Sequence, residues 1–165
     1  MLPKSFYKSE VITCTPETSI QEVARLMKEN SVGNVVVVQA NDGIAKPLGV
    51  VTDRDIVLGA ICEKIDSIAT MTASDLMSPD VILINQDMSV FEALDCLREG
   101  GVSRAPVVDE KGQLCGVLSS SRIFKILSEQ LVKLSDLSDQ RKEFPEQAKR
   151  IPKEKSSQNF DQQRH

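Results

Sequence analysis

Apolar residues recur every three or four positions in two segments that lie seventy positions apart, and this spacing predicts two amphipathic helices. The apolar positions are Ile20, Val23, Leu26 and Met27 in the first segment, and Val90, Ala93, Leu94 and Leu97 in the second. Each segment opens on a Ser-x-x-Glu capping box, Ser19–Glu22 or Ser89–Glu92, which satisfies free amides at a helix start. Asn30 and Gly100 are the expected left-handed caps at the helix ends.

Short runs of apolar, largely β-branched residues predict strands around these helices. The predicted strands, in equivalent pairs, are Val11-Ile12 and Val81-Ile82, Val35–Val38 and Ala105–Val108, and Leu48–Thr52 and Cys115–Ser119. A further helix closes each copy, from Asp53 to about Ile61 and from Ser120 to about Leu134. Each copy is therefore predicted to run strand, helix, strand, strand, helix.

A unit of about 60 residues buries little surface alone, so we expect the two copies to pack together. Because each hairpin is antiparallel and each strand-helix-strand connection suggests a parallel pair, the sheets should be mixed. We expect an α+β or α/β fold of two βαββα repeats, related by a pseudo-two-fold axis, with helices on one face of each sheet. The repeats are predicted at residues 5–68 and 69–137, and the polar residues 138–165 as a disordered or loosely helical tail.

Composition narrows the classes of function. Only 4% of the residues are aromatic and the net charge is −4, so neither a base-stacking surface nor a bulk basic footprint for nucleic acid or anionic membranes is indicated. No apolar run approaches the roughly 20 residues of a membrane span, and no signal peptide is visible. We expect a soluble, cytoplasmic protein with no nucleic-acid or membrane partner.

The sequence offers few histidine and cysteine side chains for catalysis or metal binding. The one histidine is His165, the last residue, so mechanisms that need a buried imidazole or a His-held zinc have none to use. The cysteines are widely spaced and form no Cys-x-x-Cys pair: Cys14, Cys62, Cys96 and Cys115. We interpret them as four buried, reduced thiols of an intracellular protein, with a redox sensor as the alternative that nothing in the sequence favours. We expect no metal site and no catalysis.

The order of elements and two motifs resemble the CBS-domain family. The motifs are Gly49–Asp55, which reads Gly-Val-Val-Thr-Asp-Arg-Asp, and Asp75–Val81, which is similar to the start of a CBS repeat. Two tandem repeats over roughly residues 5–134 look like a Bateman module. The resemblance implies a regulatory module that binds an adenosyl ligand (AMP, ADP, ATP or S-adenosylmethionine), forms a homodimer and modulates an unknown separate protein.

Thr52 and Asp55 have two interpretations. Thr52-x-x-Asp55 closes a strand and opens a helix, which is typical of a capping box with Asp in place of Glu. In CBS proteins that bind adenosyl ligands, the resemblance gives the same positions a ligand role. The hydroxyl donates to a phosphate oxygen at the helix start, and the carboxylate accepts the two ribose hydroxyls.

The resemblance also takes the other walls of this main pocket from the second repeat. Val81 and Ile82 would supply an apolar slot and backbone groups for the adenine. Arg104 would face the phosphate, which a guanidinium can bind bidentately, and Pro106 would lie against the base.

The equivalent pocket of the second copy departs from the pattern. Ser119 keeps the hydroxyl, but Arg122 stands where the first copy has a carboxylate, and an arginine cannot accept hydrogen bonds from a ribose. The resemblance gives this degenerate pocket walls from the first repeat, at Val11, Ile12, Asn34 and Val36. Three possibilities stay open: the pocket is empty, it binds a plain anion, or it lends Arg122 to the neighbouring phosphate.

Two functions are compatible with the sequence. The first is a nucleotide-sensing regulatory module, and the alternative is a ligand-free scaffold for dimerisation or interaction. The sequence names neither the ligand nor the regulated partner, and it does not give the direction of regulation.

Overall fold

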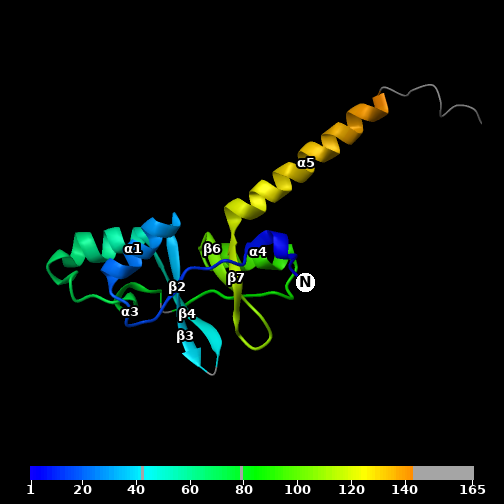
Figure 1. Ribbon diagram of the computed structural model, residues 1–165. Helices are drawn as coiled ribbons and strands as arrows, with labels where there is room; N and C mark the ends of the chain where they lie inside the picture. Colours follow the sequence, from blue (N-terminus) through cyan, green and yellow to red (C-terminus); the bar gives the residue numbers. More distant parts are fainter. Residues whose placement is uncertain (42, 79, 143–165) are drawn as a thin grey trace, which may run out of the picture. The chain divides into compact units, whose positions relative to one another are not determined.

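The two halves of the chain have the same order of elements in the computed structural model, which describes residues 1–142 except Asp42 and Pro79 (Figure 1). The first half contains β2 (Thr13–Cys14), α1 (Ile20–Asn30), β3 (Asn34–Asn41), β4 (Ile44–Thr52), α2 (Asp53–Asp55) and η2 (Ile56–Cys62). The second contains β5 (Ile84–Asn85), α4 (Val90–Glu99), β6 (Arg104–Val108), β7 (Leu114–Ser119) and α5 (Ser120–Lys142). The segments that precede each half hold η1 (Lys4–Phe6), β1 (Tyr7–Lys8), η3 (Ile65–Ser67) and α3 (Ala73–Leu76).

The first half, and the second half as far as Leu127, lie within one compact unit, Met1–Leu127, and a second unit begins at Ser128, inside α5. Of the predicted polar tail, residues 143–165 lie outside the described residues. None of the described helices combines the length and the apolar character that a bilayer crossing needs.

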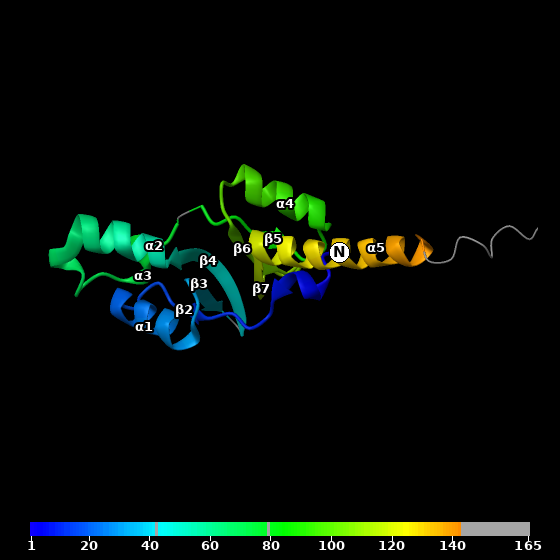
Figure 2. The same ribbon diagram turned by 90° about the horizontal axis from the view of Figure 1, so that it is seen from above.

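Each sheet mixes parallel and antiparallel pairs, as the sequence predicts. The first sheet has the order β2-β3-β4 and the second the order β1-β7-β6-β5. Figure 2 shows β2, β3 and β4 in one group and β5, β6 and β7 in another. β2 runs parallel to β3 and β5 parallel to β6, whereas the hairpins β3/β4 and β6/β7 are antiparallel. The expected mixed fold of two similar halves is thus confirmed.

One interior strand of each sheet, β3 in the first and β6 in the second, is covered on both faces. In β3, Val35 and Val37 join Val23 of α1 in one core, while Val36 on the opposite face is also fully buried. Pro106 is buried at the equivalent place in β6, and β4 of one sheet contacts β7 of the other. Burial of both faces explains why Val35–Val38 of β3 and Ala105–Val108 of β6 are apolar without polar alternation.

A segment that precedes each half completes the core of the other half. β1 pairs antiparallel with β7, and Tyr7 is buried in the second core, above Gly116. Seventy positions later, Met77 lies above Gly49 in the first half, and Ala73 of α3 is buried in the first core. Residues 71–77, placed in the second repeat by the sequence, therefore pack against the first.

The left-handed caps fall one residue later than predicted. Ser31 has φ 52° and Gly101 has φ 63°, whereas Gly100 is right-handed. Asn30 is still helical, and its side-chain amide donates to the carbonyl of Leu26. That bond holds Asn30 inside the last turn, so the change of backbone conformation passes to the next residue.

Two other elements differ in detail from the prediction. Val11-Ile12 and Val81-Ile82 lie in extended segments, and the paired strands β2 and β5 begin after them. The helix after β4 is α-helical only over α2 and continues as the π-helix η2. Such irregular turns are frequent at functional sites.

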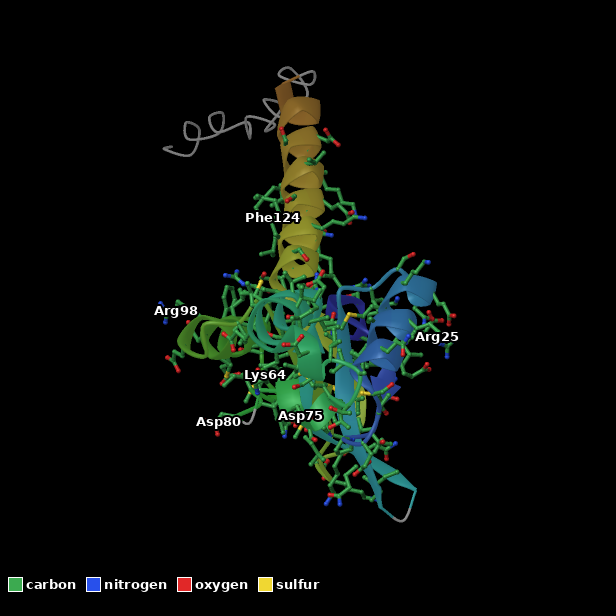
Figure 3. All side chains as sticks on the ribbon, turned by 90° about the vertical axis from the view of Figure 1, so that its left-hand side faces the viewer. Arg25, Lys64, Asp75, Asp80, Arg98 and Phe124 are labelled. Carbon is green, nitrogen blue, oxygen red and sulfur yellow. The ribbon has the colours of Figure 1, made fainter. Side chains whose placement is uncertain are left out.

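The two predicted capping boxes are seated at helix starts, but only one is complete. At α4, Ser89 accepts from the amide of Glu92, and the Glu92 carboxylate accepts from the amide of Ser89. At α1, Ser19 accepts from the amide of Glu22, yet the Glu22 carboxylate binds Arg25 instead. Figure 3 labels Arg25 on the exposed side of α1, where this ion pair forms.

Candidate functional site

Equivalent backbone bonds form the corner that follows each hairpin. The amide of Asp53 donates to the carbonyl of Gly33, and the amide of Ser120 donates to the carbonyl of Ser103. In the strand register Asn34 is directly opposite Thr52 in one hairpin, and Arg104 is opposite Ser119 in the other. The candidate site residues therefore lie where β4 and β7 turn into helices.

Thr52 and Asp55 form a complete capping box in the structure. Asp55 Oδ2 accepts from the Thr52 amide at 2.8 Å and from the Thr52 hydroxyl at 2.7 Å, and the Asp55 amide donates to Thr52 Oγ1 at 3.2 Å. The local helix-start interpretation is thus correct. Donation from Thr52 to a ligand phosphate requires its hydroxyl proton to turn away from Asp55, while Asp55 Oδ1 has no hydrogen-bond donor among the described residues.

Arg104 and Asn34 meet across the two halves. Arg104 Nη1 donates to Asn34 Oδ1 at 3.1 Å, and the two residues are equivalent, seventy positions apart. Contact between equivalent positions is what an approximate two-fold axis produces. Gly33 leaves room for this pair, because a Cβ there would lie 3.1 Å from Asp53 Oδ2 and 3.3 Å from Arg104 Nη1.

A cavity of about 190 Å³ lies beside this pair. Its lining residues are Lys8, Glu10, Val11, Ile12, Val32, Asn34, Arg104, Val117, Ser119 and Arg122. The structure therefore gathers five of the six residues predicted for the degenerate pocket. It also places Arg104, predicted for the main pocket, at the degenerate one, because the β6/β7 register sets Arg104 opposite Ser119.

Two hydrogen bonds hold Arg122 at this cavity, one from its own backbone amide and one to the backbone carbonyl of another residue. Its amide donates to Ser119 Oγ at 3.3 Å, and its Nε donates to the carbonyl of Ser5 at 2.8 Å. The Ser119 hydroxyl also lies 3.2 Å from that of Ser121. The second copy thus keeps a cap but presents a cation where the first copy presents a carboxylate.

The remaining residues predicted for the two pockets have different environments. Val81 and Ile82 are half-buried, and Ile82 packs on the second core, close to Gly100. Pro106 and Val36 are fully buried between strands and offer no accessible surface in this conformation. In this conformation Pro106 and Val36 contribute to packing, and their expected ligand contacts stay predictions.

Sequence reasoning missed the contribution of the N-terminal segment. Lys8 and Glu10 line the cavity because β1 joins the second sheet beside β7. One signal was available: the seventy-residue offset relates the motif Asp75–Val81 to residues 5–11. The other missed lining residues, Val32 and Val117, carry no distinctive motif.

Comparison with known proteins gives the family. The CBS domain family matches residues 4–59 and 73–129. An uncharacterized protein of Methanopyrus kandleri is 33% identical over 72% of this chain and 59% of its own length. The inosine-5'-monophosphate dehydrogenase of Methanocaldococcus jannaschii is 31% identical over 70% of this chain, but the match covers only 21% of that enzyme.

Among solved structures, the CBS domain pair of protein MJ0100 has a TM-score of 0.66 and 22% identity, covering 79% of this chain and 98% of that one. That structure is a complex with 5'-methylthioadenosine and S-adenosyl-L-methionine. The chain spans 59% of the Methanopyrus kandleri protein and about a fifth of the dehydrogenase, so its match to both is partial. Two matched domains, in two similar halves with the expected mixed sheets, show that the chain belongs to the CBS-domain family.

Proposed function

We propose that the chain is a regulatory module that binds an adenosyl ligand at the Thr52–Asp55 corner and modulates a separate protein. The ligand class is AMP, ADP, ATP or S-adenosylmethionine. The protein MJ0100, whose CBS pair has the same fold, is solved with two adenosyl compounds, which supports this class. We propose no catalytic step at this site, and the match to the dehydrogenase covers only 21% of that enzyme.

The observation that carries the proposal is the state of Asp55. One carboxylate oxygen is engaged by Thr52, and the other has no hydrogen-bond donor among the described residues. Asp55 is half-buried, so a hydrogen bond to a ribose hydroxyl there competes less with water than it would on an open surface. Val81 and Ile82, with accessible apolar surface, are the proposed adenine wall.

The second candidate function is a ligand-free dimerisation scaffold, and exposed apolar side chains favour it. The helices after Thr52 and Ser119 expose Val57 by 49% and Phe124 by 74%, and α4 exposes Phe91 by 78%. We propose that these helices form a two-fold homodimer, with or without ligand. Light scattering should then give twice the 18.2 kDa mass of one chain.

We propose that the protein acts in the cytoplasm. All four cysteines are free thiols, but the expected burial is right only for Cys14, because Cys62 is exposed and Cys96 and Cys115 are half-buried. Burial raises the pKa of the Cys14 thiol, which lowers its reactivity. Unpaired cysteines fit a reducing compartment.

Calorimetry with Asp55→Ala tests the ligand proposal. Loss of hydrogen bonds to the ribose should weaken AMP or ATP binding at least about tenfold, which is about 1.4 kcal/mol. A 2',3'-dideoxy analogue should bind the wild type poorly and the variant no worse than the parent nucleotide.

Asp75→Ala is a matched control, because Thr72 and Asp75 form the same capping box at α3 (Figure 3 labels Asp75). This variant should lose a helix cap and keep its nucleotide affinity. If Asp55→Ala kept its nucleotide affinity, or if the wild type bound no nucleotide, the ligand proposal would be wrong. The dimerisation scaffold would then be the remaining function.

A further inference from the structure

The cavity beside Arg104 carries an unbalanced positive charge. Lys8, Arg104 and Arg122 line it, and within the described part of the chain Glu10 is the one acidic lining residue. Among the described residues, none of these three cations forms an ion pair with a carboxylate. Two exposed arginines on α1 and α4 behave differently: Arg98, labelled in Figure 3, pairs with Asp95 at 3.0 Å, and Arg25 pairs with two glutamates.

We propose that this cavity binds a small phosphate-type oxyanion that carries no nucleoside. The inference deepens the proposed function, since it assigns the second pocket of the sensing module to a different chemical class from the first. It rests on the cavity and its charges, which do not depend on nucleotide binding at Asp55.

Hydrogen-bond donors are available in the number and type that an oxyanion needs. A guanidinium has five N–H donors, and the structure uses one on Arg122 (to Ser5) and one on Arg104 (to Asn34). The rest of each planar fork can bind an oxyanion bidentately, which is stronger and more specific than a contact with a point charge. The Ser119 hydroxyl adds a further donor to the same cavity.

Two features argue against a nucleoside in this pocket. Arg122 occupies the position of Asp55, and it cannot accept hydrogen bonds from ribose hydroxyls. The cavity of about 190 Å³ is smaller than the roughly 300–1,000 Å³ typical of pockets for drug-sized ligands. Glu10 at the wall opposes a highly charged guest, so a single phosphate group fits better than a polyphosphate chain.

The anchoring of Arg122 indicates a built site. Its Nε bond to the carbonyl of Ser5 ties the guanidinium to the N-terminal segment, and β1 of that segment brings Lys8 to the same cavity. The two cations thus come from distant parts of the chain. The bond to Ser5 holds the Arg122 side chain in place, which reduces the entropy lost when an anion binds.

Titration calorimetry with inorganic phosphate, in a buffer free of phosphate and sulfate, tests the proposal. We expect saturable binding at one site per chain, and at least a tenfold loss in both Arg122→Gln and Lys8→Gln. Arg98→Gln is the matched control, because it removes the same charge from a paired surface arginine and should keep the phosphate affinity. Binding that is absent, or lost equally in Arg98→Gln, would overturn the proposal.

Two further measurements extend the test. The first distinguishes free phosphate from a phosphorylated metabolite, and the second distinguishes the anion cavity from the Asp55 site. Glycerol 3-phosphate binding more tightly than inorganic phosphate would indicate a small phosphorylated metabolite, and the reverse order would indicate free phosphate. Asp55→Ala should lose nucleotide affinity and keep phosphate affinity, so failure of one pocket is seen independently of the other. Loss of phosphate binding in Asp55→Ala would contradict a separate anion site.

Discussion

The two halves of the molecule place opposite hydrogen-bonding groups at equivalent corners. After β4, Thr52 is followed by the acceptor Asp55, and after β7, Ser119 is followed by the donor Arg122. The backbone bonds that build the two corners are the same. Under the function proposed above, one scaffold binds two ligands of different chemistry, and the side chain at Asp55 or Arg122 selects between them.

A second difference concerns how each sheet is closed by the segment from the other half. Tyr7 lies on Gly116 of the second sheet, whereas the flexible Met77 lies on Gly49 of the first. An aromatic ring against backbone tolerates less change than a thioether chain with three rotatable bonds. The second half should thus be the more sensitive of the two to changes at its closing segment.

Tyr7→Ala should produce the largest effect on stability. Truncating this buried ring should lower the free energy of unfolding by about 3–5 kcal/mol, as truncation of other large aromatic side chains in protein cores does. Met77 is half-buried, so Met77→Ala should cost about 2 kcal/mol. Urea denaturation followed by circular dichroism measures both, and equal losses would mean that the two closing segments are energetically alike.

Alanine at Gly116 or at Gly49 adds one methyl group beneath Tyr7 or Met77, and the two substitutions compare the sensitivity of the two halves directly. A Cβ at Gly116 would lie 2.7 Å from the Lys8 carbonyl oxygen and also against the Tyr7 ring, and backbone cannot give way easily. Gly116→Ala should cost about 1–3 kcal/mol.

Gly49→Ala is the paired control for this change. The new Cβ would lie 2.9 Å from Met77 Cβ and 3.0 Å from its Cγ and Sδ. Cγ and Sδ can turn aside, but Cβ moves only with the backbone, so the loss should be about 1 kcal/mol, at the low end of the cost of overpacking. A larger loss in Gly49→Ala than in Gly116→Ala would reverse the expected order of the two halves.

Arg122→Asp should make the second corner resemble the first. It supplies the missing carboxylate and removes a cation, so nucleotide stoichiometry should rise from one to two per chain, while phosphate affinity falls. A gain of at least about tenfold at the second site, about 1.4 kcal/mol, would be visible by calorimetry. An unchanged stoichiometry would show that cavity size, and not the missing acceptor, excludes the nucleoside.

The smallest expected effect concerns acid. The backbone amide of Ser89, and then its side chain, hold the pKa of Glu92 below its usual value. Because the folded pKa is lowered, the stabilisation is present near neutral pH and is lost as the pH falls through that folded value. Glu92→Gln keeps a capping side chain, so its thermal midpoint should fall less than that of the wild type between pH 6 and about pH 3.

Glu22 provides the comparison for that measurement. Its pKa is also lowered, but by Arg25 and not by the helix-start amide. High salt should reduce the acid sensitivity that comes from Glu22 more than that from Glu92, because an exposed ion pair is screened. If acid lowered the thermal midpoint of the wild type no more than that of Glu92→Gln, Glu92 would not be a source of the acid sensitivity.

Local patterns in the sequence predicted most of the fold. Helix spacing, capping boxes and the Thr52–Asp55 bond all depend on residues within a few positions of one another, so the sequence displays them directly. The pairing of Tyr7 with Leu118 and the position of Arg104 beside Asn34 depend on how the halves pack. No local pattern reports such contacts, which is why the burial of Pro106 was also missed.

The exchange of closing segments has a consequence for how the chain is made. On the ribosome, the first core can form once residues up to Met77 have emerged, but Tyr7 must wait until Leu118 appears before β1 can pair. Contacts between residues so distant in sequence slow folding. Until β7 has emerged, the segment that contains Tyr7 is therefore unpaired and partly apolar. A nascent chain that stops before β7 would leave this segment available to bind a chaperone or a neighbouring nascent chain.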